Sequence, residues 1–265
     1  MPNVVIRDML PEDEYFVGTC SHVNESEEID AAGDRRIRLL RNLIDKGAVV
    51  KVALLNGRQV GLAHGLPIER SSWGPIGQDL IVIPCLFVKD LGTKQGIGRA
   101  LMGEVEEEAK AAGRLGATLM AFRDYPGAEW LLPAAFFERI GYEEIDNRGR
   151  YVLMWKAFAD EAIPPTFLDP SFDFEPVQGK VVVDLFFNDF CQTSNIEAQR
   201  VREVAAEFGE RVILNEYSGD DHNVLLACGI SRAIYVDGVE IGWGYEAPKD
   251  GIREAIEEAL KGTPL

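Results

Sequence analysis

The sequence predicts an α/β fold in two domains, a larger domain with a mixed sheet followed by a smaller one. The chain has 265 residues, which is more than one average domain and fewer than three. Strand-like and helix-like patterns alternate along both halves. A proline-rich stretch without either period lies between them. We therefore expect domains over residues 1–158 and 179–265, joined by a linker over residues 159–178.

Composition excludes several classes of protein. The chain is 46% hydrophobic and 27% charged, which is typical of a soluble globular protein, and no apolar run approaches the ~20 residues that a membrane-spanning helix needs. The first residues lack the basic start and apolar stretch of a secretory signal, so we expect a cytoplasmic protein with reduced cysteines. The four cysteines form no Cys-x-x-Cys pair and there are three histidines, so no metal site is expected.

The charge is strongly acidic and unevenly placed. The formal net charge is −17, which argues against binding the phosphate backbone of nucleic acid. Residues 1–158 carry 19 Lys and Arg against 23 Asp and Glu, a net charge of −4. The remaining residues carry 8 against 21, a net charge of −13. The second half therefore carries most of the net negative charge.

The first half reads as a series of strands interrupted by a few helices. An Asn56-Gly57 turn joins two strands as a hairpin, because both residue types tolerate positive φ. Strands are expected over residues 3–8, 49–55, 60–68, 79–88, 117–122, 142–146 and 151–158. Helices are expected to start at residue 11, to cover residues 34–46, to run from residue 97 to Gly113, and to centre on residues 133–140.

A glycine-rich loop leads from the strand over residues 79–88 into a helix. The first N–H groups of a helix have no partner within the helix, and the dipole there favours negative charge, so this junction is a candidate anion site. Gly96 and Gly98 allow close approach of a ligand. The spacing matches neither a P-loop nor a dinucleotide fingerprint, because Leu101 stands where the latter needs a third glycine. Taken alone, the two glycines are equally compatible with a turn and a helix cap.

Two stretches in the expected order make the first half resemble the GNAT superfamily of N-acetyltransferases. Thr93–Arg99 is similar to the family's Arg/Gln-x-x-Gly-x-Gly/Ala loop, and Ala134–Tyr142 is similar to its late helix and following strand. The resemblance covers nearly all of residues 3–158. It implies that acetyl-CoA is the cosubstrate and lies between two parallel strands that splay apart, and that an amine attacks the thioester directly in a ternary complex.

The resemblance also implies which residues bind acetyl-CoA. The pantetheine arm would bond to main-chain groups of the strand segment Leu86, Phe87 and Val88. The pyrophosphate would lie on the loop formed by Thr93, Lys94, Gln95, Gly96, Ile97, Gly98 and Arg99, with Lys94 and Arg99 supplying charge. Pro84 fits this arrangement, because a proline cannot donate to a strand ladder and is expected at an edge or a bulge. An ordinary irregularity of the strand is the alternative.

Three positions depart from the family pattern. Thr93 replaces the usual Arg or Gln of the loop, which predicts weaker binding of the cofactor. Phe137 stands where the family often has a tyrosine acid, and Val82 stands where many members have a glutamate base. The proton transfers of the reaction therefore need other groups or water.

Candidate catalytic residues each have an ordinary structural alternative. Cys85 adjoins the cofactor strand, although a cysteine on an apolar strand is most often a small buried hydrophobe. His64 is a candidate base on the second hairpin strand, or a structural imidazole. Tyr125 and Asp124 follow the strand over residues 117–122, where the fold would place the mouth of the cleft, although solvation of the loop explains the aspartate equally well.

The second half has the expected order β-α-β-α-β-β-α, which looks like a thioredoxin-type fold. Cys191 stands at the first strand-to-helix junction, which can lower the pKa of a thiol. Ser194 replaces the second cysteine of a dithiol site, so dithiol redox catalysis is not expected. An acetyltransferase followed by such a domain resembles the YoaP-like acetyltransferases, with Ala233–Gly238 and Gly242–Glu246 carrying the likeness.

The leading hypothesis is an acyltransferase that moves an acetyl group from acetyl-CoA to an amine. The acidic surplus favours a cationic acceptor. One alternative is a CoA-binding sensor or interaction module without turnover, because the usual tyrosine and glutamate are missing. Another is a thiol-linked enzyme that uses Cys191.

Overall fold

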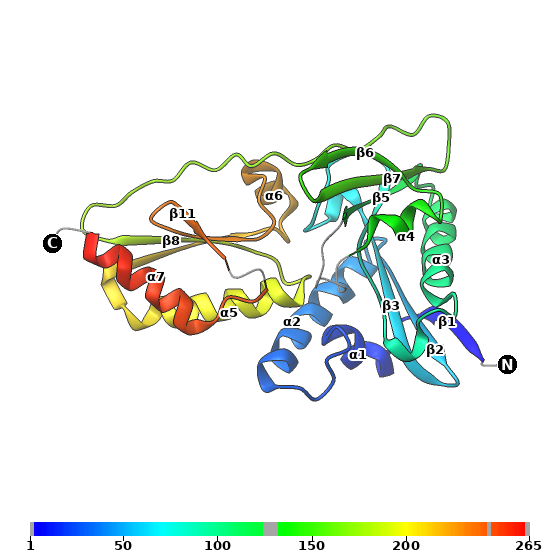
Figure 1. Cartoon of the computed structure of the whole chain (residues 1–265), viewed down its shortest axis with the longest axis horizontal. Helices are drawn as coiled ribbons and strands as arrows, with labels where there is room; N and C mark the ends of the chain where they lie inside the picture. Colours follow the sequence, from blue (N-terminus) through cyan, green and yellow to red (C-terminus); the bar gives the residue numbers. More distant parts are fainter. Residues whose placement is uncertain (1–2, 124–131, 243–244, 263–265) are drawn as a thin grey trace. The chain divides into compact units, whose positions relative to one another are not determined.

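The computed structural model describes residues 3–123, 132–242 and 245–262 (Figure 1). Its contacts divide the chain into two compact units. Unit 1 comprises residues 1–23 and 40–168, and unit 2 comprises residues 24–39 and 169–265. The two long parts meet at residue 168, inside the expected linker, and residues 24–39 group with unit 2 although the sequence placed them in the first domain. The exact limits of the expected domains stay a prediction.

Unit 1 is built on a seven-stranded mixed sheet in the order β1-β2-β3-β4-β5-β7-β6. Its strands are β1 (Val4–Asp8), β2 (Val49–Leu55), β3 (Arg58–Pro67), β4 (Leu80–Val88), β5 (Gly116–Phe122), β6 (Glu143–Arg148) and β7 (Tyr151–Ala157). Neighbours pair antiparallel except β4 and β5, which run parallel. Asn56 and Gly57 turn the β2–β3 hairpin with φ of 50° and 79°. The prediction of an α/β fold with a central mixed sheet is confirmed.

Helix α3 (Ile97–Ala111) covers one face of this sheet and packs on β2, β3 and β4. Its buried stripe repeats every four residues, at Ile97, Leu101, Val105 and Ala109, all 1% exposed or less. Burying a Leu, Ile or Val side chain contributes roughly 1.5–3 kcal/mol, so this stripe fixes the helix. A Cβ on Gly65 of β3 would lie 2.8 Å from Cγ1 of Val105, so the close approach requires glycine.

The other helices of unit 1 are short. They are the 3₁₀ turn η1 (Pro11–Asp13), α1 (Glu14–Gly18), the 3₁₀ turns η2 (Ile68–Arg70) and η3 (Asp90–Gly92), and α4 (Ala134–Glu138). Helix α2 (Glu27–Ile44) begins earlier than the expected helix over residues 34–46, with Glu27, Glu28 and Asp30 in its first turn. Acidic residues stabilise this end of a helix, which accounts for the earlier start.

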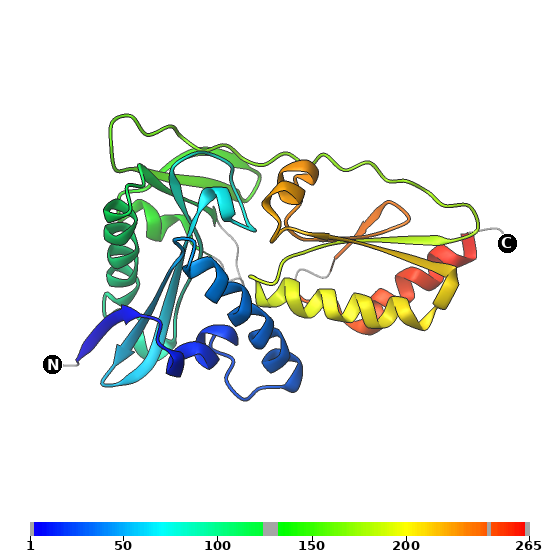
Figure 2. The ribbon, with the colours of Figure 1, turned by 180° about the vertical axis from the view of Figure 1, so that it is seen from behind.

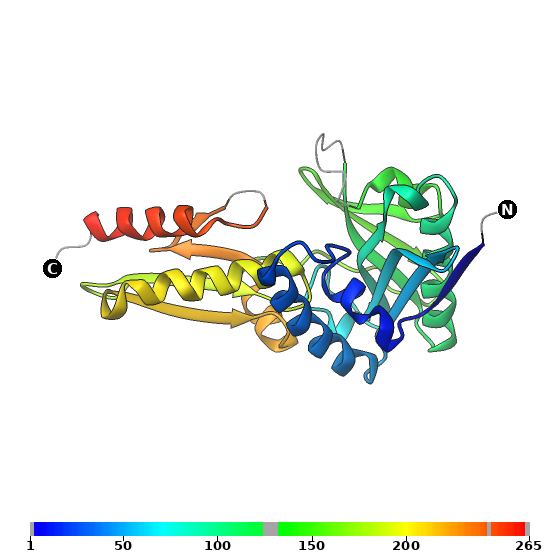
Figure 3. The ribbon, with the colours of Figure 1, turned by 90° about the horizontal axis from the view of Figure 1, so that it is seen from below.

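Unit 2 is built on a four-stranded sheet in the order β11-β10-β8-β9. Its elements are β8 (Val181–Phe187), α5 (Gln192–Glu207), the 3₁₀ turn η4 (Gly209–Arg211), β9 (Val212–Ser218), α6 (His222–Cys228), β10 (Ala233–Val236), β11 (Val239–Ile241) and α7 (Lys249–Gly262). Strands β8 and β9 are parallel, and β10 is antiparallel to β8 and β11. Helices α5 and α7 lie together along this sheet and share its core (Figure 3). The expected order of elements is therefore present, as a second, small α/β unit.

The stretch between the two sheets, residues 158–180, contains no helix or strand (Figure 2). It is nevertheless anchored. Thr166 pairs with Ile76 of unit 1 as an isolated bridge, and Ser171 N–H donates to Cys228 C=O of unit 2 at 2.8 Å. The ring of Phe172 lies 4.9 Å from that of Phe186, between centroids. The segment is thus a strap that belongs partly to each unit.

Residues 24–39 are held in unit 2 by polar contacts with α5. Arg200 donates to both carboxylate oxygens of Glu28, at 2.7 and 2.6 Å. Arg35 Nε donates to Asn195 Oδ1 at 2.5 Å, and Asn195 Nδ2 donates to Ala32 C=O at 3.3 Å. These pairs join residues more than 150 positions apart, which explains why the periodicity of the helix alone places the segment elsewhere.

Candidate active site and cofactor groove

Strands β4 and β5 pair briefly and then separate. Residues 80–82 lie opposite residues 116–118 in parallel register. Beyond Val82, β4 continues to Val88 and β5 to Phe122, and among the described residues no further pair joins the two strands. A parallel pair that opens in this way leaves main-chain groups along both inner edges for another partner. The opening has the arrangement that the family resemblance implies.

The main-chain groups of Leu86 and Val88 point into this opening. In an antiparallel pair, every second residue turns its N–H and C=O toward the partner strand. Lys89 N–H donates to Val60 C=O of β3 at 2.7 Å. Phe87 and Lys89 therefore face β3, while Leu86 and Val88 present their groups to the opposite edge. Phe87, named with its neighbours as a cofactor contact, lies beside the opening with its main chain turned to β3.

A bulge lies at Pro84, where the strands part. Cys85 lies opposite His64, and Val82 lies opposite Leu66, so three steps along β4 match two steps along β3. The extra residue falls between Val82 and Cys85, a segment that contains Pro84. Because proline has no N–H to give the ladder, the bulge forms here. The sequence leaves a bulge and an ordinary irregularity of the strand open at Pro84, and the shift of register lies at this residue.

The N–H groups from Lys94 to Arg99 follow β4 in a turn and the first residues of helix α3, and none of them bonds to a carbonyl of that helix. The first bond that helix α3 makes in this turn runs from Ala100 N–H to Gly96 C=O, at 3.0 Å. Gly96 caps the helix with φ of 77°, which glycine adopts without strain. A Cβ on Gly98 would lie 3.9 Å from Val88, so the helix begins beside the end of β4. Unpaired amides and the helix dipole together favour an anion.

The side chains of this loop largely fix its own main chain. Thr93 Oγ1 donates to Asp90 C=O at 2.8 Å, and Gln95 Nε2 donates to Leu91 C=O at 2.8 Å. Arg99 Nη2 donates to a main-chain carbonyl at residue 139, at 3.1 Å. Lys94 is exposed and has φ of 59°. Lys94 is thus the cation of the loop that is open to solvent without a bond to its own helix.

His64 and Cys85 are directly opposite each other on β3 and β4. His64 is fully buried, and Cys85 is partly exposed. Their neighbours Ala63 and Leu86 belong to the core under α3, so alternation along the strands places His64 and Cys85 on the other face of the sheet. Side chains directly opposite in an antiparallel pair lie with Cβ atoms roughly 4.5–5.5 Å apart. The sequence named both residues separately, and the structure brings them together.

The two positions where the family pattern places an acid and a base lie in the core. Phe137 is fully buried, and its ring contacts those of Phe136 and Tyr142 edge-on at 5.0 and 5.5 Å. Val82 is also fully buried. Tyr125 and Asp124 lie outside the described residues.

A buried polar cluster supports the helix that carries the loop. Lys156 Nζ of β7 donates to Glu106 Oε2 of α3 at 2.7 Å and to Ile140 C=O at 3.0 Å. Burial raises the pKa of Tyr142 well above its ordinary value, and the neighbouring Glu106 carboxylate raises it further. The phenol therefore stays protonated, and the cluster ties α3 to the strand that pairs with β5.

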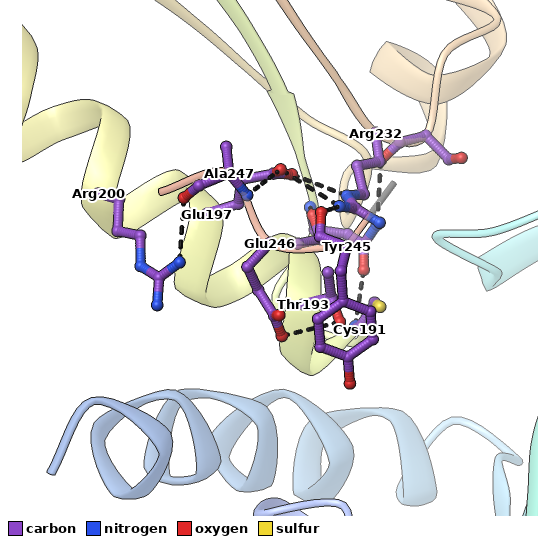
Figure 4. A network of polar contacts seen from close by, with 11 residues as sticks. Cys191, Thr193, Glu197, Arg200, Arg232, Tyr245, Glu246 and Ala247 are labelled. Carbon is purple, nitrogen blue, oxygen red and sulfur yellow. Dashed lines mark hydrogen bonds and ion pairs between the residues drawn. The ribbon is translucent and has the colours of Figure 1, made fainter. Parts of the chain in front are cut away.

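In unit 2, Cys191 caps helix α5 and is partly exposed (Figure 4). Its N–H donates to Asn188 Oδ1 at 2.8 Å, and its C=O accepts from Asn195 N–H at 2.9 Å. Ser194, at the position of a second cysteine, is 1% exposed and accepts from Asn188 N–H at 2.9 Å. The hydroxyl of Ser194 therefore stabilises the turn beneath Cys191.

Arg232 adjoins Cys191 and is held by a network that Figure 4 shows. Arg232 Nε donates to Glu197 Oε2 at 2.7 Å, and Arg232 Nη2 donates to Tyr245 C=O at 2.6 Å. Ala247 N–H donates to the same carboxylate at 2.9 Å. Burial opposes the charge of Arg232, but the hydrogen bond and charge of Glu197 hold the pKa of Arg232 above its ordinary value. The guanidinium stays cationic beside the thiol.

A cavity of about 680 Å³ lies elsewhere in unit 2, between the start of α2, α5 and the start of α7. Most of its charges are already paired. Arg200 bonds Glu28, and Lys249 forms an ion pair with Glu203. The residues that line it are Glu27, Glu28, Ala31, Arg35, Gln199, Arg200, Glu203, Pro248 and Lys249. No local pattern in the sequence marks this cavity, because helices far apart in the chain build it.

Sequence reasoning missed two further polar features. Met120 of β5 turns its main chain into the opening, because Phe122, two residues on, donates its N–H away from β7 to Leu132 C=O at 2.8 Å. Asp184 is 2% exposed within β8 and accepts from Asn215 Nδ2 at 2.9 Å. A charged residue inside the apolar run of residues 181–187 is a signal that could have identified Asp184. Nothing in the sequence marks Met120.

Comparisons with known proteins find likeness in structure alone. No protein-family model matches the chain, and no curated protein matches it. A PaiA N-acetyltransferase from Thermoplasma acidophilum, solved with coenzyme A, is 17% identical, with a TM-score of 0.42 over 59% of this chain and 99% of that one. YncA from Salmonella typhimurium, a putative acetyltransferase solved with acetyl-CoA, is 16% identical, with a TM-score of 0.45 over 61% and 97%. A putative acetyltransferase of the GNAT family from Desulfovibrio desulfuricans is 18% identical, with a TM-score of 0.45 over 59% and 100%.

The described part of the chain contains neither a membrane-spanning helix nor a metal-binding cluster. None of its helices has the length and apolar character needed to cross a bilayer. Within the same residues, no group of three or more His, Cys, Asp or Glu side chains is placed to hold a metal ion.

Proposed function

We propose that the first domain transfers an acetyl group from acetyl-CoA to an amine. One observation carries the proposal: β4 and β5 part after Val82, and the chain then supplies the amides from Lys94 to Arg99, which precede the first bond of helix α3. A pantetheine arm is an extended chain with amide groups, so it can take the place of a strand along the free edge of β4. A diphosphate is an anion of the kind that the amides of a helix start bind.

Each part of the cofactor has a partner in this arrangement. The amides of the pantetheine arm bond to the main chain of Leu86 and Val88, which faces the opening. The diphosphate lies on the amides of the loop, and the exposed Lys94 adds a charge to them. The thioester then reaches the bulge at Pro84, where the two strands begin to part.

The reaction is a direct transfer. The amine nitrogen attacks the carbonyl carbon of the thioester, the carbon–sulfur bond breaks, and CoA leaves as a thiolate. The nitrogen loses one proton and the thiolate gains one, so atoms and charge balance. The net charge of −17 raises the local concentration of cations, so we propose a cationic acceptor.

Binding and turnover are tested separately on the purified full chain. At a hundredfold its dissociation constant, acetyl-CoA adds ~2.7 kcal/mol to the free energy of unfolding of the unit that binds it. ATP, a polyanion without a pantetheine arm, serves as the control and adds little. Release of CoA is then followed with polyamines, amino acids, aminoglycosides and peptides. Acetyl-CoA that fails to stabilise the protein more than ATP does contradicts the proposal.

A CoA-binding module without turnover is the second candidate. Val82 and Phe137 favour it, because both occupy expected acid–base positions with buried apolar side chains. Stabilisation by acetyl-CoA combined with no CoA release from any amine would support the module. Release of CoA with one amine would remove it.

We also propose that unit 2 is a thioredoxin-type domain of the YoaP-like kind, with Cys191 as a single reactive thiol. The partial exposure of Cys191 at the start of α5, beside a permanently charged Arg232, supports this assignment. Cys191→Ser should abolish activity if the thiol takes part in the reaction. Cys228→Ser, also in unit 2, is the matched control, and an unchanged rate in Cys191→Ser removes this candidate.

A further inference from the structure

The two strands that border the opening, together with the neighbouring segment of β3, contain two ionisable side chains. These segments are Leu62–Leu66 of β3, Leu80–Val88 of β4 and Gly116–Phe122 of β5. Within them, the ionisable residues are His64 and Cys85, and all other side chains are apolar or carry a hydroxyl. They lie directly opposite each other, next to the bulge. Among the described residues of these segments, this pair can therefore exchange a proton near the thioester.

The pair is placed on one side of the sheet. A Cβ on Gly65 would contact Val105 of α3, so Gly65 and the residues two apart from it on β3 face that helix. His64 and Cys85 therefore lie on the face of the sheet opposite α3. His64 is fully buried, whereas Cys85 is partly exposed, so the thiol is the member of the pair that can meet a ligand.

We propose that Cys85 is the catalytic acid that protonates the departing CoA thiolate, and that His64 positions the thiol and returns its proton. This inference rests on the proposed acetyl transfer. The proposal follows from two observations. Cys85 is the thiol on the strand that borders the groove, and the strand register places the His64 imidazole opposite it.

The step balances. As the amine attacks, the carbon–sulfur bond of the thioester breaks and its electron pair stays on the CoA sulfur. The Cys85 S–H proton passes to that sulfur and gives CoA as a thiol. His64 passes a proton to the Cys85 thiolate, and the proton lost by the amine restores His64. A thiol is well matched to this task, because donor and acceptor are both sulfur and the transfer costs little driving force.

The test compares Cys85→Ala with Cys228→Ala, a partly buried cysteine of unit 2. CoA release from acetyl-CoA is measured with the best amine of the panel, and with water as acceptor where no amine reacts, because both reactions release the same thiolate. We expect Cys85→Ala to lower kcat by about 100-fold and to leave the stabilisation by acetyl-CoA unchanged. Cys228→Ala should keep the wild-type kcat and the wild-type stabilisation by acetyl-CoA. An unchanged kcat in Cys85→Ala overturns the inference and leaves acetyl transfer standing.

A second pair of measurements separates the remaining outcomes. Cys85→Ser keeps the shape of the side chain and replaces the thiol by a far weaker acid, so a folded Cys85→Ser with full kcat also overturns the proposal. Acetyl-CoA without acceptor should leave the wild-type mass unchanged, since an acetyl group found on Cys85 would make it a nucleophile instead. For His64→Gln we expect a fall in kcat with KM for acetyl-CoA unchanged, and a change in KM alone contradicts its positioning role. No binding of acetyl-CoA by the wild type would refute the proposed function itself.

Discussion

Val82 and Thr118 form the last pair of the parallel ladder between β4 and β5. Thr118 is fully buried, and its hydroxyl donates to Met154 C=O of β7 at 2.9 Å, so β5 is tied to β7 at the point where β4 leaves it. From Val82 onward, β4 keeps β3 on one side and has its other edge free. The groove proposed for acetyl-CoA therefore begins at this pair.

Hydrogen exchange of backbone amides tests directly whether acetyl-CoA binds along the free edge of β4. The N–H groups of Leu86 and Val88 face the opening, and the N–H of Phe87 faces β3. Acetyl-CoA should slow exchange at Leu86 and Val88 and leave Phe87, which is already bonded, nearly unchanged. Exchange measured by NMR on the full chain checks this. Equal rates with and without acetyl-CoA at both residues would show that the pantetheine arm lies elsewhere.

Reversing the charge of Lys94 should weaken binding of acetyl-CoA. Lys94→Glu brings a carboxylate to the amides that hold the diphosphate, and a loss of about 1.4 kcal/mol corresponds to a tenfold rise in Kd. Lys46→Glu makes the same change of charge at another exposed lysine of unit 1. Titration of both variants by calorimetry separates a local effect from a change in net charge. Equal weakening in the two variants would assign the effect to net charge alone.

Gly65 should tolerate no side chain. A Cβ there would lie 2.8 Å from Cγ1 of Val105 and 3.0 Å from Cγ1 of Ile81. Gly65→Ala should therefore lower the free energy of unfolding by roughly 1–3 kcal/mol. Gly103→Ala, on the open side of α3, is the control and should raise stability by up to about 1 kcal/mol. Urea denaturation of both variants measures the difference, and a stable Gly65→Ala would mean that α3 sits farther from β3.

Asp13 should stabilise unit 1 at neutral pH and lose that effect in acid. Burial opposes the charge of Asp13, but hydrogen bonds from Arg7 and Gln59 hold the pKa of its carboxyl below the ordinary value. A pKa lowered by folding contributes stability above the unfolded pKa, and the contribution falls as the pH drops through the folded pKa. Asp13→Asn should cost about 1–3 kcal/mol at pH 7, and the deficit should shrink below about pH 4.

The exposed Asp45 supplies the control for that measurement. Asp45→Asn should leave the free energy of unfolding close to that of the wild type throughout the same pH range. A deficit in Asp13→Asn that stays constant down to pH 3 would show that the loss comes from packing rather than from the charge.

Arg200 and Glu28 should show coupling in a double-mutant cycle. Arg200 Nη2 lies 2.6 Å from Glu28 Oε2, with side chains 21% and 33% exposed. We expect a coupling free energy of about 1 kcal/mol in the unfolding of unit 2. The more exposed pair Arg253 and Glu207 should give a smaller coupling free energy. Coupling near zero for Arg200 and Glu28 would mean that residues 24–39 are not held by α5.

Local patterns predicted most of the fold. The β2–β3 hairpin follows from Asn56-Gly57, the buried stripe of α3 follows from its four-residue spacing, and the bulge follows from Pro84. Each is decided by residues close together in the chain. The assignment of residues 24–39 to unit 2 depends on Arg200, which is far away in sequence, and no local pattern contains it.

Some features of the candidate site can be predicted from local patterns in the sequence, and others cannot. Gly96 and the free amides of the loop can be predicted, because a strand, a glycine-rich turn and a helix follow one another. The pairing of His64 with Cys85 could not, because register depends on the bulge that shifts β4 by one residue. The direction of the main chain at Leu86, Val88 and Met120 depends on the same register.

The ring of Phe172 has a practical consequence for anyone who expresses the C-terminal part of unit 2 as a separate fragment. It lies on Phe186, Tyr217 and Tyr235, between 4.9 and 5.7 Å from their centroids, although it precedes β8 in the chain. A fragment cut at residue 179 would uncover three aromatic rings at once, and such a patch promotes aggregation. A recombinant fragment should therefore begin before Asp169, so that Phe172 is present and covers the three rings.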